Sequence, residues 1–206
     1  DQHWLYLLET LGMLGPNLQI VHLSDSTKPL LDIIKKTGST VIHCPSEKMK
    51  NAKGQYELEL LWEQGIPLGL GTGGADSNAS FNLFNEAHIA ILLEKFEYQN
   101  SVAKAPKNLI RMITLGGAET LGINHLVGSI ERGKKADFIA ISLQNAEIDT
   151  NKDIFTSLIE GNSGASVDYV FISGKTIMEN GALKTIKEDH LKEKRNKWFH
   201  RLNNND

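Results

Sequence analysis

The sequence predicts an α/β fold with parallel strands, followed by a smaller β-rich region. A strand and then a helix recur three times within residues 18–96, and alternation of this kind implies parallel strands joined by crossover helices. Beyond residue 124, short apolar runs and Gly-containing turns replace the helical pattern. We therefore divide the chain into residues 1–124, 125–186 and 187–206.

Each element of the first region follows from its local pattern. The expected strands are short and apolar: residues 18–22, 40–43 and 67–71. The expected helices show helical apolar spacing or helix stop signals: residues 4–14, 28–36, 57–64, 81–96 and 106–121. Residues 46–54 are polar and end in Gly54, which predicts a loop.

The later regions carry β and then helical signals. Strands are expected over residues 128–131 and 136–141, and a β-hairpin over residues 168–178 with its turn at Ser173-Gly174-Lys175. Residues 187–201 are basic and amphipathic, with Leu191, Trp198 and Leu202 on one stripe. We expect this segment to be a helix that docks on the body of the protein; contact with a membrane or a nucleic acid is the alternative.

Composition and charge exclude several classes of protein. Lys and Arg number 22 against 25 Asp and Glu, which gives a net charge of −3 and a pI near 6.2, whereas strongly basic nucleic-acid-binding domains have a pI above about 9. The mean hydropathy of −0.26 and the lack of a long apolar run argue against a transmembrane helix. The single Cys44 excludes an internal disulfide and favours a reducing compartment. We therefore expect a cytoplasmic protein with no nucleic-acid or membrane partner.

Polar residues at the strand ends are the candidates for chemistry. His22 ends the first expected strand, His43 ends the second, and the loop from Gly71 to Asn78 follows the third. Parallel α/β folds place their sites at the carboxyl ends of strands. A histidine there can bind a metal or transfer protons, because its pKa lies near neutrality; packing is the alternative role. The Gly-rich loop lacks the Gly-Lys-Ser/Thr of a phosphate-binding loop.

Several motifs carry a resemblance to a known family. They are Leu14-Gly15-Pro16, Val21-His22, His43-Cys44-Pro45-Ser46, Leu70-Gly71-Thr72, Thr114-Leu115-Gly116-Gly117-Ala118 and, most specific, the stretch from Val127 to Phe138. Together they resemble the amidohydrolase superfamily, in the branch of S-adenosylhomocysteine/methylthioadenosine deaminases and triazine chlorohydrolases. The similarity extends from about Leu11 to Leu183.

The resemblance implies a fold and a site. Residues 1–124 would form the C-terminal half of a (β/α)8 TIM-type barrel, with its sixth to eighth strands, and residues 125–186 would form β-sandwich strands. In this family a divalent metal, zinc or iron, lies at the carboxyl ends of the strands, and most of its ligands would precede Asp1. His22 would polarise the substrate or its attacking water, while His43, Ser77 and Asn78 would shape the substrate pocket.

The sequence departs from the family pattern at two places. The family expects an Asp that binds the metal and transfers a proton, but the loop reads Gly71-Thr72-Gly73-Gly74, so no metal ligand can be named here. Asp76 could substitute only if the loop were rebuilt. The Ser-Asn pair usual after His-x-Pro is replaced by Glu47-Lys48, which puts the usual substrate in doubt.

Two function classes remain open. The first is a metal-dependent hydrolase that breaks a C–N or C–Cl bond of a purine- or triazine-like ring; this chain alone would be inactive. The alternative is a non-catalytic binding or scaffold protein with the same fold, and a third reading is an engineered or shortened chain.

Because the chain opens at Asp1 without Met, we expect upstream sequence. We also expect the partner to be the N-terminal half of the barrel or another protomer, since unpaired strand edges would leave the chain unstable as an isolated monomer.

Overall fold

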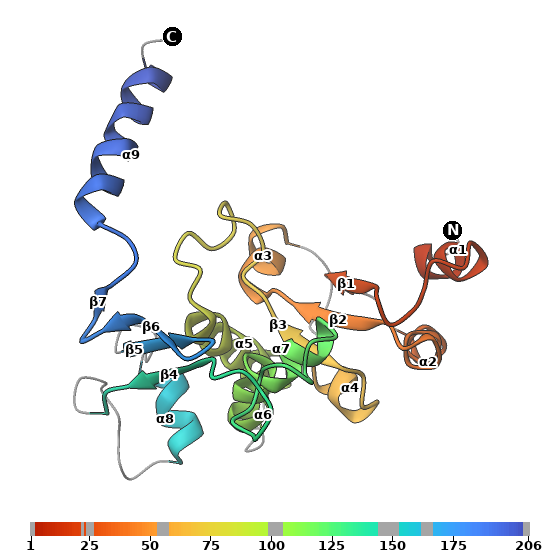
Figure 1. The fold of residues 1–206 in the computed structure, drawn as a ribbon. Coiled ribbons are helices and arrows are strands. Elements are labelled where there is room, and N and C mark those ends of the chain that lie inside the picture. Colours follow the sequence, from red (N-terminus) through yellow and green to blue (C-terminus); the bar gives the residue numbers. More distant parts are fainter. Residues whose placement is uncertain are drawn as a thin grey trace.

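Within the residues that the computed structural model describes, two separate sheets form the framework (Figure 1). One is parallel and belongs to the first half of the chain, and the other is antiparallel and belongs to the second half. The structure describes residues 3–21, 23, 27–52, 58–98, 105–143, 153–161 and 167–203.

In the described part of the chain, the parallel sheet has three short strands in the order β1-β2-β3. These are β1 (Gln19–Val21), β2 (Thr40–His43) and β3 (Leu68–Leu70). Ile20 lies opposite Val41, and His43 lies opposite Leu70. All three residues of β3 are buried, as expected for a parallel strand covered on both faces. The predicted parallel α/β arrangement is confirmed.

Seven helices accompany this sheet within the described residues. They are α1 (Trp4–Thr10), α2 (Lys28–Thr37), α3 (Pro45–Lys50), α4 (Leu58–Glu63), α5 (Leu83–Tyr98), α6 (Ala105–Met112) and α7 (Leu115–Thr120). The local signals are clearest in α2, where Pro29 lies in the first turn and Gly38 ends the helix with φ +75°. Proline tolerates the first turn and glycine tolerates a left-handed C-cap. The buried Leu30, Leu31 and Ile34 then join the core.

The core lies between the sheet and the helices that follow it. Helix α7 packs on β2 and β3, while α5 and α6 contact β3. Close approach of α7 depends on Gly69, because a Cβ there would lie 2.7 Å from Thr120 Oγ1. The carbonyl oxygen of Thr120 accepts hydrogen bonds from Gln19 Nε2 and Thr40 Oγ1, both at 3.2 Å. Carbonyl groups in the last turn of a helix have no partner within the helix. Side chains of β1 and β2 thus supply the donors for the Thr120 carbonyl at the end of α7.

The second region forms an antiparallel sheet in the order β4-β5-β6-β7. Its elements are α8 (Ile154–Glu160), β4 (Phe138–Ile141), β5 (Val167–Ile172), β6 (Lys175–Glu179) and β7 (Ala182–Leu183). The predicted hairpin is confirmed, with positive φ at both Ser173 and Gly174 of its turn. Rings of Phe138 and Phe171 stack across β4 and β5 with centroids 4.6 Å apart. Helix α8 packs on α5 and α6 and so joins this region to the first.

The C-terminal helix α9 (Glu188–Asn203) forms as predicted but does not dock. It extends away from the rest of the chain beyond β7 (Figure 1). The apolar side chains predicted to pack, Leu191, Trp198 and Leu202, are 50%, 63% and 65% exposed. The docking expectation is therefore wrong for the described residues. None of the described helices is both long and apolar enough to cross a bilayer.

Three further expectations differ from the structure. The predicted loop 46–54 contains α3, which Pro45 opens at its first turn. The predicted helix 106–121 is divided between α6 and α7 at Thr114, whose backbone leaves helical angles with ψ −104°. No strand forms at residues 128–131, because Gly128 adopts φ +96° and the Ser129 hydroxyl donates locally to Glu131 at 2.5 Å.

Candidate functional site

The carboxyl ends of β2 and β3 lie side by side and carry most of the predicted site residues. His43 ends β2 and is 8% exposed. The backbone N–H of Gly71 donates to the His43 carbonyl oxygen at 2.9 Å, which continues the pairing of the two strands by one residue. His22 lies outside the described residues, directly after the end of β1 at Val21. The structure therefore brings His43 and the Gly71–Asn78 loop to one edge and leaves the role of His22 a prediction.

The loop after β3 is held close to Cys44. A Cβ on Gly71 would lie 2.9 Å from Ile42 Cγ2 and 3.0 Å from Cys44 Sγ, so only glycine fits there without a shift. Burial raises the pKa of the Cys44 thiol to about 11, with smaller contributions from the Glu47 and Glu86 carboxylates. A thiol with a raised pKa is a poor nucleophile near neutrality. Its burial and raised pKa favour a structural role for Cys44 over a catalytic one.

A buried hydrogen-bond network fixes the far end of the same loop. Asn78 Nδ2 donates to Glu86 Oε1, and the backbone N–H of Ser46 donates to Glu86 Oε2 at 3.1 Å. Asn78 Oδ1 accepts from the backbone N–H and the hydroxyl of Ser80 at 3.0 and 2.7 Å. Glu86 is completely buried, and Ser77 and Asn78 are each 6% exposed. Asn78 thus holds the loop in shape, and its contact with substrate stays a prediction.

Glu47 occupies the space next to Gly73, the position where the family pattern has an Asp. A Cβ built on Gly73 would overlap the Glu47 carboxylate and would lie 2.9 Å from its Cδ and 3.1 Å from its Cβ. Gly73 itself has φ +67°. Asp76, the weak substitute proposed from the sequence, is exposed and folds its side chain over Gly74. The half-buried Glu47 therefore comes nearest to position 73.

The described residues do not form a metal site by themselves. No group of three or more His, Cys, Asp or Glu side chains in these ranges could hold a metal ion. Glycine at position 73 offers no donor atom, and Glu86 uses both carboxylate oxygens within its network. A divalent ion at this edge would need ligands from outside the described residues.

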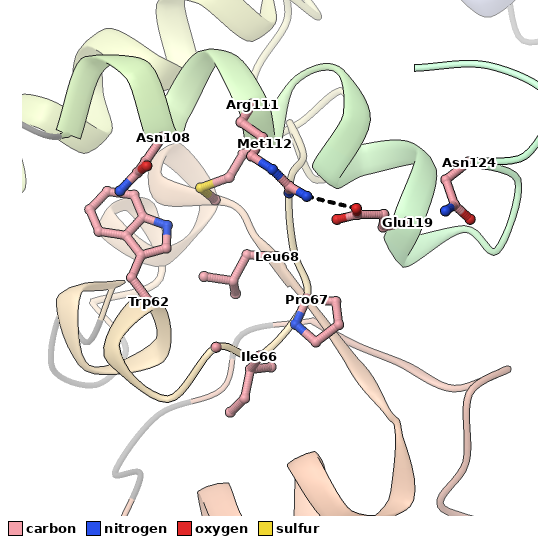
Figure 2. Close-up of a pocket in the computed structure, with 10 residues that line it drawn as sticks. Trp62, Ile66, Pro67, Leu68, Asn108, Arg111, Met112, Glu119 and Asn124 are labelled. Atoms are coloured by element: carbon pink, nitrogen blue, oxygen red, sulfur yellow. Dashed lines mark hydrogen bonds and ion pairs between the residues drawn. The ribbon is translucent and has the colours of Figure 1, made fainter. Parts of the chain in front are cut away.

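A cavity of about 600 Å³ lies at the opposite end of the sheet (Figure 2). Its wall includes Pro67 and Leu68, where β3 begins, whereas the predicted site follows the end of β3. Arg111 pairs with Glu119 at 2.6 Å along this wall, opposite the Trp62 ring. In barrels of parallel strands the amino-terminal end serves stability rather than chemistry. This cavity is therefore separate from the candidate site.

The sheet, its crossover helices and the loops at its carboxyl edge define part of a (β/α) barrel. Residues 3–177 match the family model described as "Amidohydrolase family". The chain belongs to the amidohydrolase family, as the resemblance predicted.

Similar proteins are deaminases and a chlorohydrolase. The chain is 32% identical over 94% of its length to a 5-methylthioadenosine/S-adenosylhomocysteine deaminase of Saccharophagus degradans. It is 35% identical over 95% of its length to a 5'-deoxyadenosine deaminase of Methanobrevibacter smithii. It spans 44% and 45% of these two relatives, so it corresponds to less than half of each.

Solved structures support the same partial fold. A zinc-bound adenosine deaminase from Xanthomonas campestris matches with a TM-score of 0.90 and 28% identity, over 98% of this chain and 46% of that one. A zinc complex of an atrazine chlorohydrolase from Arthrobacter aurescens matches with a TM-score of 0.83 and 23% identity, over 92% and 42%. The second likeness concerns the fold alone. The predicted fold class, part of a TIM-type barrel followed by β strands, is confirmed.

Sequence reasoning missed two residues of this edge. The sequence marks Glu47 only as a departure from the family pattern within an expected loop, and it assigns no role to Glu86. A buried carboxylate such as Glu86 could have been suspected from its place in the first turn of an apolar helix. The approach of Glu47 to Gly73 joins two different strand–helix units, and no local pattern signals it.

Proposed function

We propose that the protein carrying this chain is a hydrolytic deaminase that acts on the purine ring of an adenosine-type nucleoside. Water would add to the ring carbon that carries the amino group, the C–N bond would break, and ammonia would leave. The observation that carries this proposal is the 32% and 35% identity to two adenosine-derivative deaminases across almost the whole chain.

The residues of the carboxyl edge have roles in this proposal. His22 would polarise the substrate or its attacking water, and His43, Ser77 and Asn78 would shape the pocket. Support comes from the pairing of His43 with the start of the Gly71–Asn78 loop. The role of His22 rests on the family resemblance alone, because this residue lies outside the described ranges.

A zinc or iron ion is part of the proposal for the whole protein. Two similar structures were crystallised with zinc, and a bound divalent ion lowers the pKa of its water towards about 7. Because the described residues hold no cluster of three suitable ligands, the ion would need ligands from the rest of the protein. We therefore expect this chain by itself to be inactive.

The partner in this proposal is the N-terminal half of the barrel. Among the described strands, β1 and β3 have one neighbour each, and such open edges favour pairing with further strands. Exposed apolar side chains of α1, such as Leu7 at 60%, add surface that a partner could cover. The isolated chain should elute as an aggregate or oligomer and unfold without a cooperative transition, and a compact, cooperatively unfolding monomer would contradict this expectation.

The function can be tested by incubating the full-length protein with adenosine, 5'-deoxyadenosine, methylthioadenosine and S-adenosylhomocysteine. Ammonia release and conversion of adenine to hypoxanthine in the product, followed by mass spectrometry, would support the proposal. Absence of turnover for all four compounds, with zinc or iron supplied during purification, would refute it.

A non-catalytic binding protein is the second candidate, because Gly73 lacks the carboxylate that the family pattern supplies. Calorimetric binding of the same nucleosides without ammonia release would favour this function. Turnover of any of them would exclude it.

A further inference from the structure

The side chain of Glu47 fills the space that a side chain at position 73 would need. The Glu47 carboxylate would have to move aside, and the Glu47 Cβ, 3.1 Å from the new atom, would still lie in tight contact with it. Real Cβ atoms almost never approach other atoms closer than 3.0 Å, whereas Glu47 Cδ would lie at 2.9 Å. The glycine at 73 and the glutamate at 47 are thus sterically matched.

The strands and loops of the fold create this match. Glu47 lies in the first turn of α3, four residues after His43, and Gly73 lies three residues after Leu70. His43 and Leu70 are opposite each other in the β2–β3 pair, and the loop after β3 rises beside α3 (Figure 1). Lys50 Nζ also donates to the Asp76 carbonyl oxygen at 2.6 Å, which ties α3 to the same loop.

The other described carboxylates of this edge are engaged differently. Glu86 is fully buried and accepts hydrogen bonds from Asn78 and Ser46 on its two oxygens. Asp76 is exposed and lies against Gly74 at the outer part of the loop. Glu47 is half-buried and is the described carboxylate that reaches position 73.

We propose that Glu47 supplies from α3 the acid–base carboxylate that the loop after β3 lacks at position 73. This inference rests on the proposed deamination. The Glu47 carboxylate would accept a proton from the attacking water as the C–O bond forms. It would then give that proton to the amino nitrogen as the C–N bond breaks, so that hydroxyl replaces the amino group and ammonia leaves.

The first experiment compares carboxylate variants of the full-length protein. Glu47→Gln should lower kcat by about 10²- to 10⁴-fold, the usual loss for a missing general acid–base group, while Asp76→Asn and the exposed control Glu63→Gln should stay within about threefold of wild type. In a Glu47→Gly background, adding Gly73→Asp should raise kcat at least tenfold above that of Glu47→Gly alone, because Asp tolerates positive φ and no side chain at position 47 then fills the space.

The second experiment tests the steric match without activity. In the wild-type background Gly73→Ala should lower the melting temperature, because the new methyl group meets the Glu47 side chain and because φ is +67°. In a Glu47→Gly background the same substitution should cost clearly less, since only the backbone strain remains. Equal losses in the two backgrounds would overturn the placement of Glu47.

The outcomes separate this inference from the proposed function. An inactive wild-type protein refutes the deaminase proposal and with it the chemical role of Glu47. An active wild type with an equally active Glu47→Gln variant overturns the inference and leaves the deaminase proposal standing. A large loss in Asp76→Asn, with little loss in Glu47→Gln, also overturns it and assigns the role to Asp76.

Discussion

Asn78 donates its side-chain amide to the fully buried carboxylate of Glu86, and this contact joins the loop after β3 to the first turn of α5. The second oxygen of Glu86 accepts from the backbone N–H of Ser46 in α3. One carboxylate therefore holds together three segments that surround the carboxyl edge of the sheet.

Glu86→Ala should destabilise the protein by about 1–3 kcal/mol, because the buried Asn78 amide and the partly buried Ser46 N–H would both lose their acceptor. The measurement is urea-induced unfolding of the full-length protein. Asn85→Ala is the matched control, since Asn85 is the exposed neighbour on the same helix, and it should change stability by less than about 0.5 kcal/mol. Equal effects of both variants would contradict the structural role of Glu86.

Because of Glu94, the free energy of unfolding should decrease as the pH rises from about 4.5 to about 7. Burial, and less strongly the charge of Glu59, raises the pKa of Glu94 from 4.5 to about 7. Both its oxygens lack a hydrogen-bond partner among the described residues. In this window the unfolded state loses the proton while the folded state keeps it, so ionisation favours unfolding.

Melting temperatures of wild type and Glu94→Gln between pH 4.5 and pH 8 test this expectation. The variant carries no titrating group, so it should gain stability relative to wild type as the pH rises and then keep a constant advantage above about pH 7. A difference between the two proteins that does not change with pH would contradict the raised pKa.

Cys44 should react slowly with thiol reagents while the protein is folded. Since burial raises its pKa to about 11, about one thiol in a thousand is ionised at pH 8, and the side chain is 3% exposed. The measurement follows the coloured thiolate that an aromatic disulfide reagent releases when it reacts with a protein thiol. Subtracting the colour released from the Cys44→Ser variant leaves the part that comes from Cys44. This Cys44 signal should appear only after denaturation. Its rapid appearance in the native protein would contradict the burial of the thiol.

Gly116→Ala should destabilise the protein although alanine favours helices. A Cβ at position 116 would lie 2.6 Å from the Leu68 carbonyl oxygen and 3.0 Å from that of Arg111, and crowding of this kind costs about 1–3 kcal/mol. Gly15→Ala is the matched control, because no heavy atom lies within 4 Å of its Cβ position. Calorimetric melting that shows equal effects of the two substitutions would contradict the close packing of α7 on β3.

Local patterns account for much of the fold. The strand β2 is correctly predicted by the short pattern Thr40–His43. The helix α2 is correctly predicted by Pro29 in its first turn and Gly38 at its end. The division at Thr114 depends on packing of α7 against the sheet, and α3 is a six-residue helix that begins after a strand. Elements this short depend on tertiary contacts more than on helix propensity.

The candidate site was predictable only where it follows strand ends. His43 and the loop Gly71–Asn78 could be named because parallel strands bring their carboxyl ends together. The relation between Glu47 and Gly73 could not, because it depends on the register of β2 and β3 and on the direction of one side chain. The sequence shows a missing Asp at position 73, whereas the structure shows a carboxylate from elsewhere beside it.

Because β2 is the middle strand of the parallel sheet, hydrogen exchange at its backbone amides reports on both of its neighbours. The N–H of Thr40 donates to the Leu18 carbonyl oxygen on the β1 side, and the N–H of Val41 donates to that of Pro67 on the β3 side, both at 3.1 Å. Exchange at these two adjacent amides therefore reports separately on the opening of the two sides of the sheet. A protein that loosens first along β1 would expose the Thr40 amide to deuterium while the Val41 amide remained protected.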